Sequence, residues 1–184
     1  MRFIDSRHDP WERNVGEDGP LAHPAVKPHS LLSLTQWHAV RKSWPVGVSV
    51  GVSLPNSADI EVIAPDLARL ELVELHFPKW VDGRAYSQAR LLRSRYRYWG
   101  ELRAVGEVLV DMMPMLKRTG FNAVVLRQDQ KRASAERALA FFPGYYQGDV
   151  NQVRPAFARD VVSELAAHAE RQQAEADSML GHGI

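Results

Sequence analysis

One short segment of the chain gathers most of the side chains that could take part in chemistry. Within residues 77–87 these side chains are Lys79, Asp82, Arg84, Tyr86 and Ser87. Two cations so close together could hold an anion, helped by the free N–H groups at the start of a following helix. Asp82 could orient one cation or act as a general base. The competing interpretation is structural: Asp82 and Gly83 form a turn, Lys79 is solvated, and Arg84 pairs with a carboxylate.

Two later segments carry further candidates. Glu107 could serve as a general base or offer oxygen atoms to a metal ion. Asp111 could do the same, although capping the next helix explains it equally well. Arg127 follows a predicted strand and could face a ligand, or it could neutralise Asp129 or Glu107.

These residues follow strands in an alternating pattern of strands and helices. Strands are predicted over 46–52, 72–77, 101–105 and 121–126, and helical segments over 64–70, 82–98, 111–119 and 129–142. Four successive strand–helix units predict an α/β fold with parallel strands. The sheet is either a partial (half) β/α barrel, which we favour, or an open parallel sheet. If the strands are neighbours, their following loops share one rim.

The remaining segments flank this α/β domain, which we place at residues 31–147. Residues 1–30 are broken by proline and glycine and predict an irregular arm, with a short strand only over 2–4. Ser33 is suited to cap a short helix that runs to Trp44. Residues 148–184 predict an amphipathic helix over 155–173 and a frayed tail. That helix could dock on the domain or pair with a second subunit.

Composition excludes several classes of function. The chain has 184 residues and a formal net charge of +1, so charge gives no general argument for nucleic acid or membrane partners. It has no cysteine, which excludes a protein-held iron–sulfur cluster, a thiol redox couple and a cysteine nucleophile. No secretory signal or membrane span is apparent, which predicts a cytoplasmic protein.

Known cofactor and metal motifs are also missing from the sequence. There is no GxGxxG after a strand, no phosphate-binding P-loop, no GxSxG elbow and no HExxH pair. We therefore expect no cofactor and no metal ion. Arg90, Arg93 and Arg97 share one predicted helix face. A solvated face, or a surface for an acidic partner, explains them better than nucleic acid binding does.

Two ordered motifs resemble a known bacterial family. They are PKxxDGRxYSxARLLR over residues 78–93 and GELRAVGxV over residues 100–108. Together with the glycine–phenylalanine step at 120–121, they make residues 30–147 similar to the bacterial domain of unknown function 934. The resemblance implies a proteobacterial protein whose gene commonly lies beside those for sulfite reductase and sulfate assimilation. It also implies the label of a probable oxidoreductase of sulfite reduction, without catalytic residues to carry over.

Three functional hypotheses follow from the residues and the resemblance. The first is an accessory protein of assimilatory sulfite reduction that binds the sulfite reductase haemoprotein or its electron donor. The second is a small-anion-binding enzyme, in which Lys79 and Arg84 hold the ligand and Asp82 or Glu107 moves a proton. The third is a structural homodimer, because a half-barrel leaves strand edges that a second copy could cover. The sequence leaves open whether the protein is an enzyme.

Overall fold

The fold was analysed in a computed structural model of the chain. The structure describes residues 1–16, 19–142, 144–158, 160, 162, 165, 166, 169, 170 and 173. Among them, seven strands form one sheet in the order β1-β9-β8-β7-β6-β5-β2. Their bounds are Arg2–Phe3 (β1), Ala123–Val124 (β9), Glu101–Gly106 (β8), Leu72–Phe77 (β7), Val50–Leu54 (β6), Ser30–Ser33 (β5) and Glu12–Arg13 (β2).

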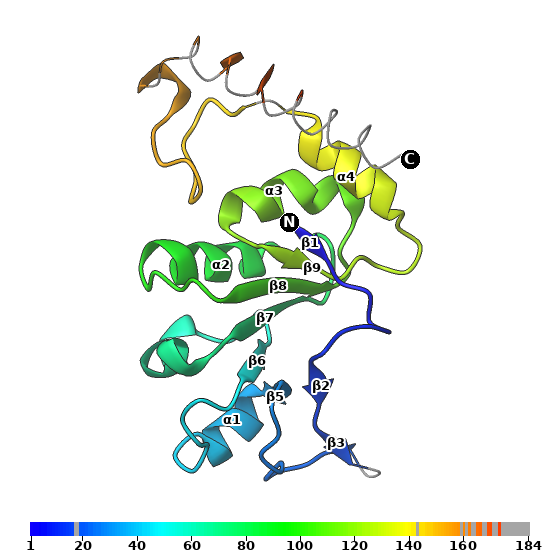
Figure 1. Ribbon diagram of the computed structural model, residues 1–184, viewed down its shortest axis with the longest axis vertical. Coiled ribbons are helices and arrows are strands. Elements are labelled where there is room, and N and C mark those ends of the chain that lie inside the picture. The colour runs from blue at the N-terminus through cyan, green and yellow to red at the C-terminus, as the bar shows by residue number, and fades with distance from the viewer. Residues whose placement is uncertain are drawn as a thin grey trace.

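Every pairing in this sheet is parallel, and the sheet curls into a half-barrel (Figure 1). This confirms the predicted α/β fold and the favoured architecture. A separate antiparallel ribbon pairs β3 (Val15–Gly16) with β4 (Gly19–Pro20) in the arm. The predicted short strand at the start of the arm is also confirmed, as β1.

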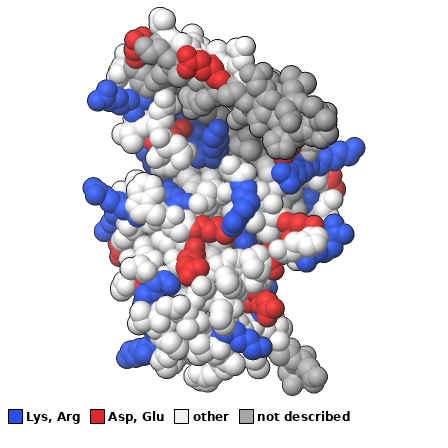
Figure 2. Space-filling model, viewed as in Figure 1, with Lys and Arg blue, Asp and Glu red and all other residues white. Residues whose placement is uncertain are grey.

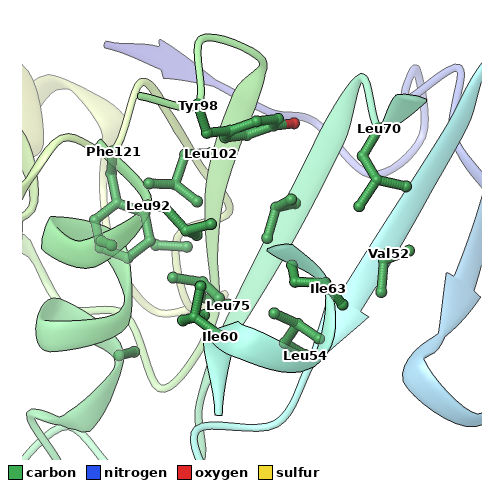
Figure 3. Close-up of a cluster of buried hydrophobic side chains, with 14 of the residues drawn as sticks. Val52, Leu54, Ile60, Ile63, Leu70, Leu75, Leu92, Tyr98, Leu102 and Phe121 are labelled. Atoms are coloured by element: carbon green, nitrogen blue, oxygen red, sulfur yellow. The ribbon is translucent and has the colours of Figure 1, made fainter. Parts of the chain in front are cut away.

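The helical segments cover one face of the sheet and bury the apolar core against it. They are α1 (Leu34–Val40), η1 (Ile60–Val62), η2 (Ala64–Arg69), α2 (Arg84–Ser94), η3 (Val110–Met112), α3 (Met113–Thr119) and α4 (Arg132–Ala140). Alternate strand residues such as Val52, Leu75 and Leu102 lie in one apolar cluster with the helical residues Ile60, Ile63 and Leu92 (Figure 3). Burial of this face supplies the main driving force for folding.

Local capping explains several of the element boundaries. Ser33 caps α1 as predicted, because its hydroxyl accepts from Gln36 N and the Gln36 side chain accepts from Ser33 N. The helix ends at Val40 rather than at Trp44. Trp44 is still buried, and its indole donates to Val48 O at 3.1 Å. Gly120, with φ of 102°, ends α3 as predicted because a left-handed residue terminates a helix.

Several predicted boundaries are wrong. β6 begins at Val50 instead of Val46, because Gly47 turns the chain with φ of 86° and leaves Val46 94% exposed. α2 ends at Ser94 rather than Tyr98. Asp111 lies inside the short turn η3 and does not cap α3.

The C-terminal helix predicted over 155–173 lies largely outside the described residues. What the structure describes there is a 3-10 turn at Ala156–Ala158 (η4) and a helical conformation at residues 162, 165, 166, 169, 170 and 173.

The opposite, concave face of the sheet carries a buried row of polar residues. Strand register places Ser53, Glu74, Arg103 and Ala123 side by side across β6, β7, β8 and β9. Glu74 and Arg103 are only 2% and 1% exposed. Buried charges require paired partners, so this row limits what can lie above it.

The N-terminal arm supplies these partners. Asp9 accepts two hydrogen bonds from the Arg103 guanidinium, at 2.5 and 3.1 Å. Arg13 donates to Glu74 Oε1 at 2.5 Å, and Ser53 Oγ donates to the same oxygen at 2.8 Å. Because β1 pairs with β9 and β2 pairs with β5, the arm crosses the open side of the half-barrel and reaches both of its edges (Figure 1).

We expect Asp9→Ala to lower the free energy of unfolding by about 3 kcal/mol, because Arg103 stays buried and, among the described residues, keeps Glu101 as its one charged partner. Asp5→Ala is the matched control, since Asp5 pairs with the neighbouring Arg7 and His8 at the surface. Urea denaturation of both variants measures the difference. Equal stability of the two variants would show that the arm is not held by this pair.

Candidate functional site

The loop after β7 is short and tightly folded. Asp82 N donates to Lys79 O at 3.0 Å, which closes a turn, and Tyr86 N donates to Gly83 O at 3.0 Å. Gly83 directly precedes α2 and offers no side chain to cap it. The loop therefore presents its side chains from a fixed backbone at the carboxyl end of β7.

Within this loop, Asp82 and Arg84 form a two-pronged ion pair. Arg84 Nη2 lies 2.7 Å from Asp82 Oδ2, and Arg84 Nε lies 3.0 Å from Oδ1. The guanidinium holds the pKa of the Asp82 carboxyl well below its usual range, and the carboxylate raises the pKa of Arg84. Asp82 is thus a weak proton acceptor, and an anion would have to displace it to reach Arg84.

Arg127 forms a second, separate cluster after β9. It donates to Glu107 Oε2 at 2.6 Å and to both carboxylate oxygens of Asp129 at 2.6 and 2.7 Å. These two partners raise the pKa of Arg127, and Arg127 lowers the pKa of Asp129 to about 2. The side-chain contacts of Arg127 therefore agree with the interpretation in which it neutralises Asp129 and Glu107.

The remaining candidates differ in exposure. Lys79 and Ser87 are exposed, and Lys79 makes no ion pair with the part of the chain that the structure describes. Tyr86 packs edge-on against Phe77 with ring centroids 5.0 Å apart, and burial raises its pKa to about 12. Its phenol therefore stays protonated at neutral pH.

The structure thus brings the predicted site residues to one edge of the sheet, but in two clusters. Glu107 N donates to Phe77 O at 2.8 Å, and Arg127 N donates to Val108 O at 3.1 Å, so the loops after β7, β8 and β9 are linked. Each cluster neutralises its own arginine. Whether the clusters act on a common ligand stays a prediction.

The buried pair of strand neighbours Glu74 and Arg103, with the half-buried Ser53 beside Glu74, was not predicted from the sequence. The sequence did contain a sign of these buried charges, because Glu74 and Arg103 each interrupt a largely apolar strand. Between these residues and the arm lies a cavity of about 280 Å³, lined by Arg2, Phe3, Ile4, Asp5, His8, Asp9, Pro10 and Arg103. Arg103 has two carboxylate partners there, so the cavity offers no unneutralised cation.

The predicted basic face of the second helix does not exist as one surface. Arg97 lies beyond the end of α2, with φ of 50°, and Arg93 turns inward to donate to backbone carbonyls. On the face shown in Figure 2, basic and acidic side chains are mixed. Neither observation favours a nucleic acid partner.

Two apolar side chains project from the loop after β7. Trp80 is 57% exposed and Val81 is 65% exposed, next to the exposed Lys79. We call Lys79–Val81 the apolar tip. Exposed tryptophans are common anchors of protein interfaces, so this feature points to binding rather than to catalysis.

The described residues show neither a metal site nor a membrane-spanning helix. They contain no group of three or more histidine, aspartate or glutamate side chains arranged to hold a metal ion. None of their helices combines the length and apolar character that crossing a bilayer requires.

Fold and site together define a half-barrel α/β protein with its candidate residues at the carboxyl edge of a parallel sheet. The chain belongs to the family described as bacterial protein of unknown function (DUF934), whose family model matches residues 51–157, more than half of the chain. No curated protein matches the chain. The matched region starts within β6 and includes both arginine clusters and the apolar tip.

We predict that Arg127→Gln raises the pKa of Asp129 from about 2 toward the ordinary value of 3.8, because it removes the main cause of the shift. The folded-state pKa is depressed, so the pair stabilises the fold above pH 3.8 and this contribution is lost as the pH falls to about 2. Carboxyl NMR titration measures the midpoint. Arg84→Gln is the control and should leave Asp129 unchanged. An unchanged Asp129 midpoint in Arg127→Gln would contradict the pairing.

Proposed function

We propose that the protein is a cytoplasmic accessory protein of assimilatory sulfite reduction, which binds the sulfite reductase haemoprotein or its electron donor through the apolar tip. The pathway comes from the family resemblance, and the docking role comes from the exposure of Trp80 and Val81. That exposure is the observation that carries the proposal.

The rigidity of the tip favours its use in binding. The turn hydrogen bond from Asp82 N to Lys79 O and the Asp82–Arg84 ion pair hold the loop in one shape. A loop that is already ordered loses little entropy when a partner binds. Trp80 supplies a large apolar area, and Lys79 adds a charge at the edge of that area.

The enzyme hypothesis stays as a second proposal with a different requirement. An anionic substrate would bind Lys79 directly but would have to separate Arg84 from Asp82, whose oxygens lie 2.7 and 3.0 Å from the guanidinium. The internal pairing of both rim arginines therefore favours the accessory role. A thermal shift with sulfite or sulfate that disappears in Lys79→Ala would favour the enzyme instead.

The dimer hypothesis also stays untested. Its argument from open strand edges is weakened, because β1 and β2 of the arm pair with β9 and β5 and form the two sides of the sheet. The two edge strands are only two residues long, and short edges resist pairing with another chain.

We expect Trp80→Ala to weaken binding to the reductase haemoprotein or to its donor by at least roughly ten-fold, as loss of an aromatic anchor does. Val81→Ser should weaken binding less. Val46→Ser is the matched control, because Val46 is also exposed but precedes β6, at the opposite end of the strands. Pull-down and titration with each purified component measure the effect.

Two outcomes would overturn this docking surface. One is that the Trp80→Ala variant binds its partner with the affinity of the wild-type protein. The other is an equal loss of binding in Val81→Ser and Val46→Ser, which would indicate a non-specific effect of removing exposed valines. Absence of binding by the wild-type protein to either component would contradict the accessory role itself.

A further inference from the structure

A second cavity lies at the amino ends of β8 and β9, opposite the apolar tip. It has a volume of about 220 Å³ and is lined by Arg93, Tyr98, Trp99, Gly120, Phe121, Asn122, Val150 and Asn151. Three parts of the chain build it: the end of α2 with its following turn, the start of β9, and the segment around Val150. None of these residues belongs to the rim described above.

Backbone carbonyls fix the position of Arg93 in the cavity wall. Its Nε donates to Gly120 O at 2.9 Å, and its Nη1 donates to Gly100 O at 3.0 Å and to Tyr98 O. The guanidinium also lies over the Tyr98 ring, 5.6 Å from its centroid. Gly120 is required here, because a Cβ at this position would collide with the Arg93 side chain.

The opposite wall is tied to α3. Val150 N donates to Arg118 O at 3.3 Å, and the Asn151 amide donates to Lys117 O at 2.6 Å. A Cβ on Gly120 would also lie 3.0 Å from Val150 Cγ2, so Val150 and Arg93 approach the same glycine from two sides. The two walls are therefore held at a fixed separation.

Arg93 shares with the partly buried Arg69 a set of backbone-carbonyl partners, and it differs in this from three other arginines. Arg103, Arg118 and Arg127 each have a carboxylate within 4.0 Å. Among the described residues Arg93 has carbonyl partners only, and its Nη2 makes no hydrogen bond. Burial without a counterion lowers the pKa of Arg93. Desolvation of an unneutralised cation costs free energy, which a bound anion would restore.

We propose that this cavity binds a small oxyanion, such as phosphate, sulfate or a carboxylate, with Arg93 as the charged donor. The Asn122 amide nitrogen makes, among the described residues, a single long hydrogen bond of 3.4 Å to Gly100 O and provides a second donor. Trp99 is 88% exposed at the edge of the cavity and offers an apolar face to the ring of an aromatic carboxylate. This site is independent of the docking surface proposed above.

The test introduces an internal counterion. Val150→Glu places a carboxylate in the cavity wall beside Arg93, where it competes with a bound anion. Val153→Glu is the matched control, because Val153 is exposed and does not line the cavity. Isothermal titration with phosphate, sulfate and benzoate, each at constant ionic strength set with chloride, compares the two variants with the wild-type protein. Constant ionic strength keeps general screening the same in every titration.

The wild type and Val153→Glu should bind at least one of the three anions, and Val150→Glu should bind it at least roughly ten-fold more weakly. Tighter binding of benzoate identifies a carboxylate ligand, and tighter binding of phosphate or sulfate identifies a tetrahedral one. If Val150→Glu does not fold, Arg93→Gln replaces it, since its amide can still reach a carbonyl. Lack of binding to the wild type, or equal binding by all folded variants, overturns the proposal.

Discussion

The interior of the half-barrel is organised by the need to neutralise two buried charges. Glu74 and Arg103 are register neighbours on adjacent strands, and both are almost fully buried. Each needs further partners, because the desolvation of a buried charge is costly. Asp9 and Arg13 of the arm provide these partners. The position of the arm is therefore fixed by electrostatics as well as by strand pairing.

This constraint decides which surfaces remain for function. The arm crosses the concave face and occupies Glu74 and Arg103 with its own ion pairs. The carboxyl end of the sheet presents the apolar tip, and the amino end presents the cavity around Arg93. The first is a surface of apolar character and the second is a site of unneutralised positive charge. The proposed protein docking and anion binding thus lie at opposite ends of the strands.

Local signals made much of the fold predictable. Leu72–Phe77 forms β7 as predicted, since an apolar run stopped by proline leaves little alternative, and Ser33 and Gly120 end their elements through capping that depends on neighbours in sequence. β5 was missed because it is four residues long and follows an irregular arm. The candidate residues follow strands as predicted, and the pairing of Arg127 with Glu107 and Asp129 was one of the two interpretations that the sequence offered for it. The contacts between the arm and the sheet were not predictable. The pair of Asp9 with Arg103 spans 94 positions of the chain, so no local spacing reveals it.

We propose that the protein acts at the sulfite step of assimilation as a helper of another protein. Growth of a strain that lacks its gene, with sulfate, sulfite or cysteine as the sole sulfur source, tests this proposal most directly. We predict failure on sulfate and on sulfite, rescue by cysteine, and restored growth when the wild-type gene is returned. Normal growth of the strain on all three sulfur sources would contradict it.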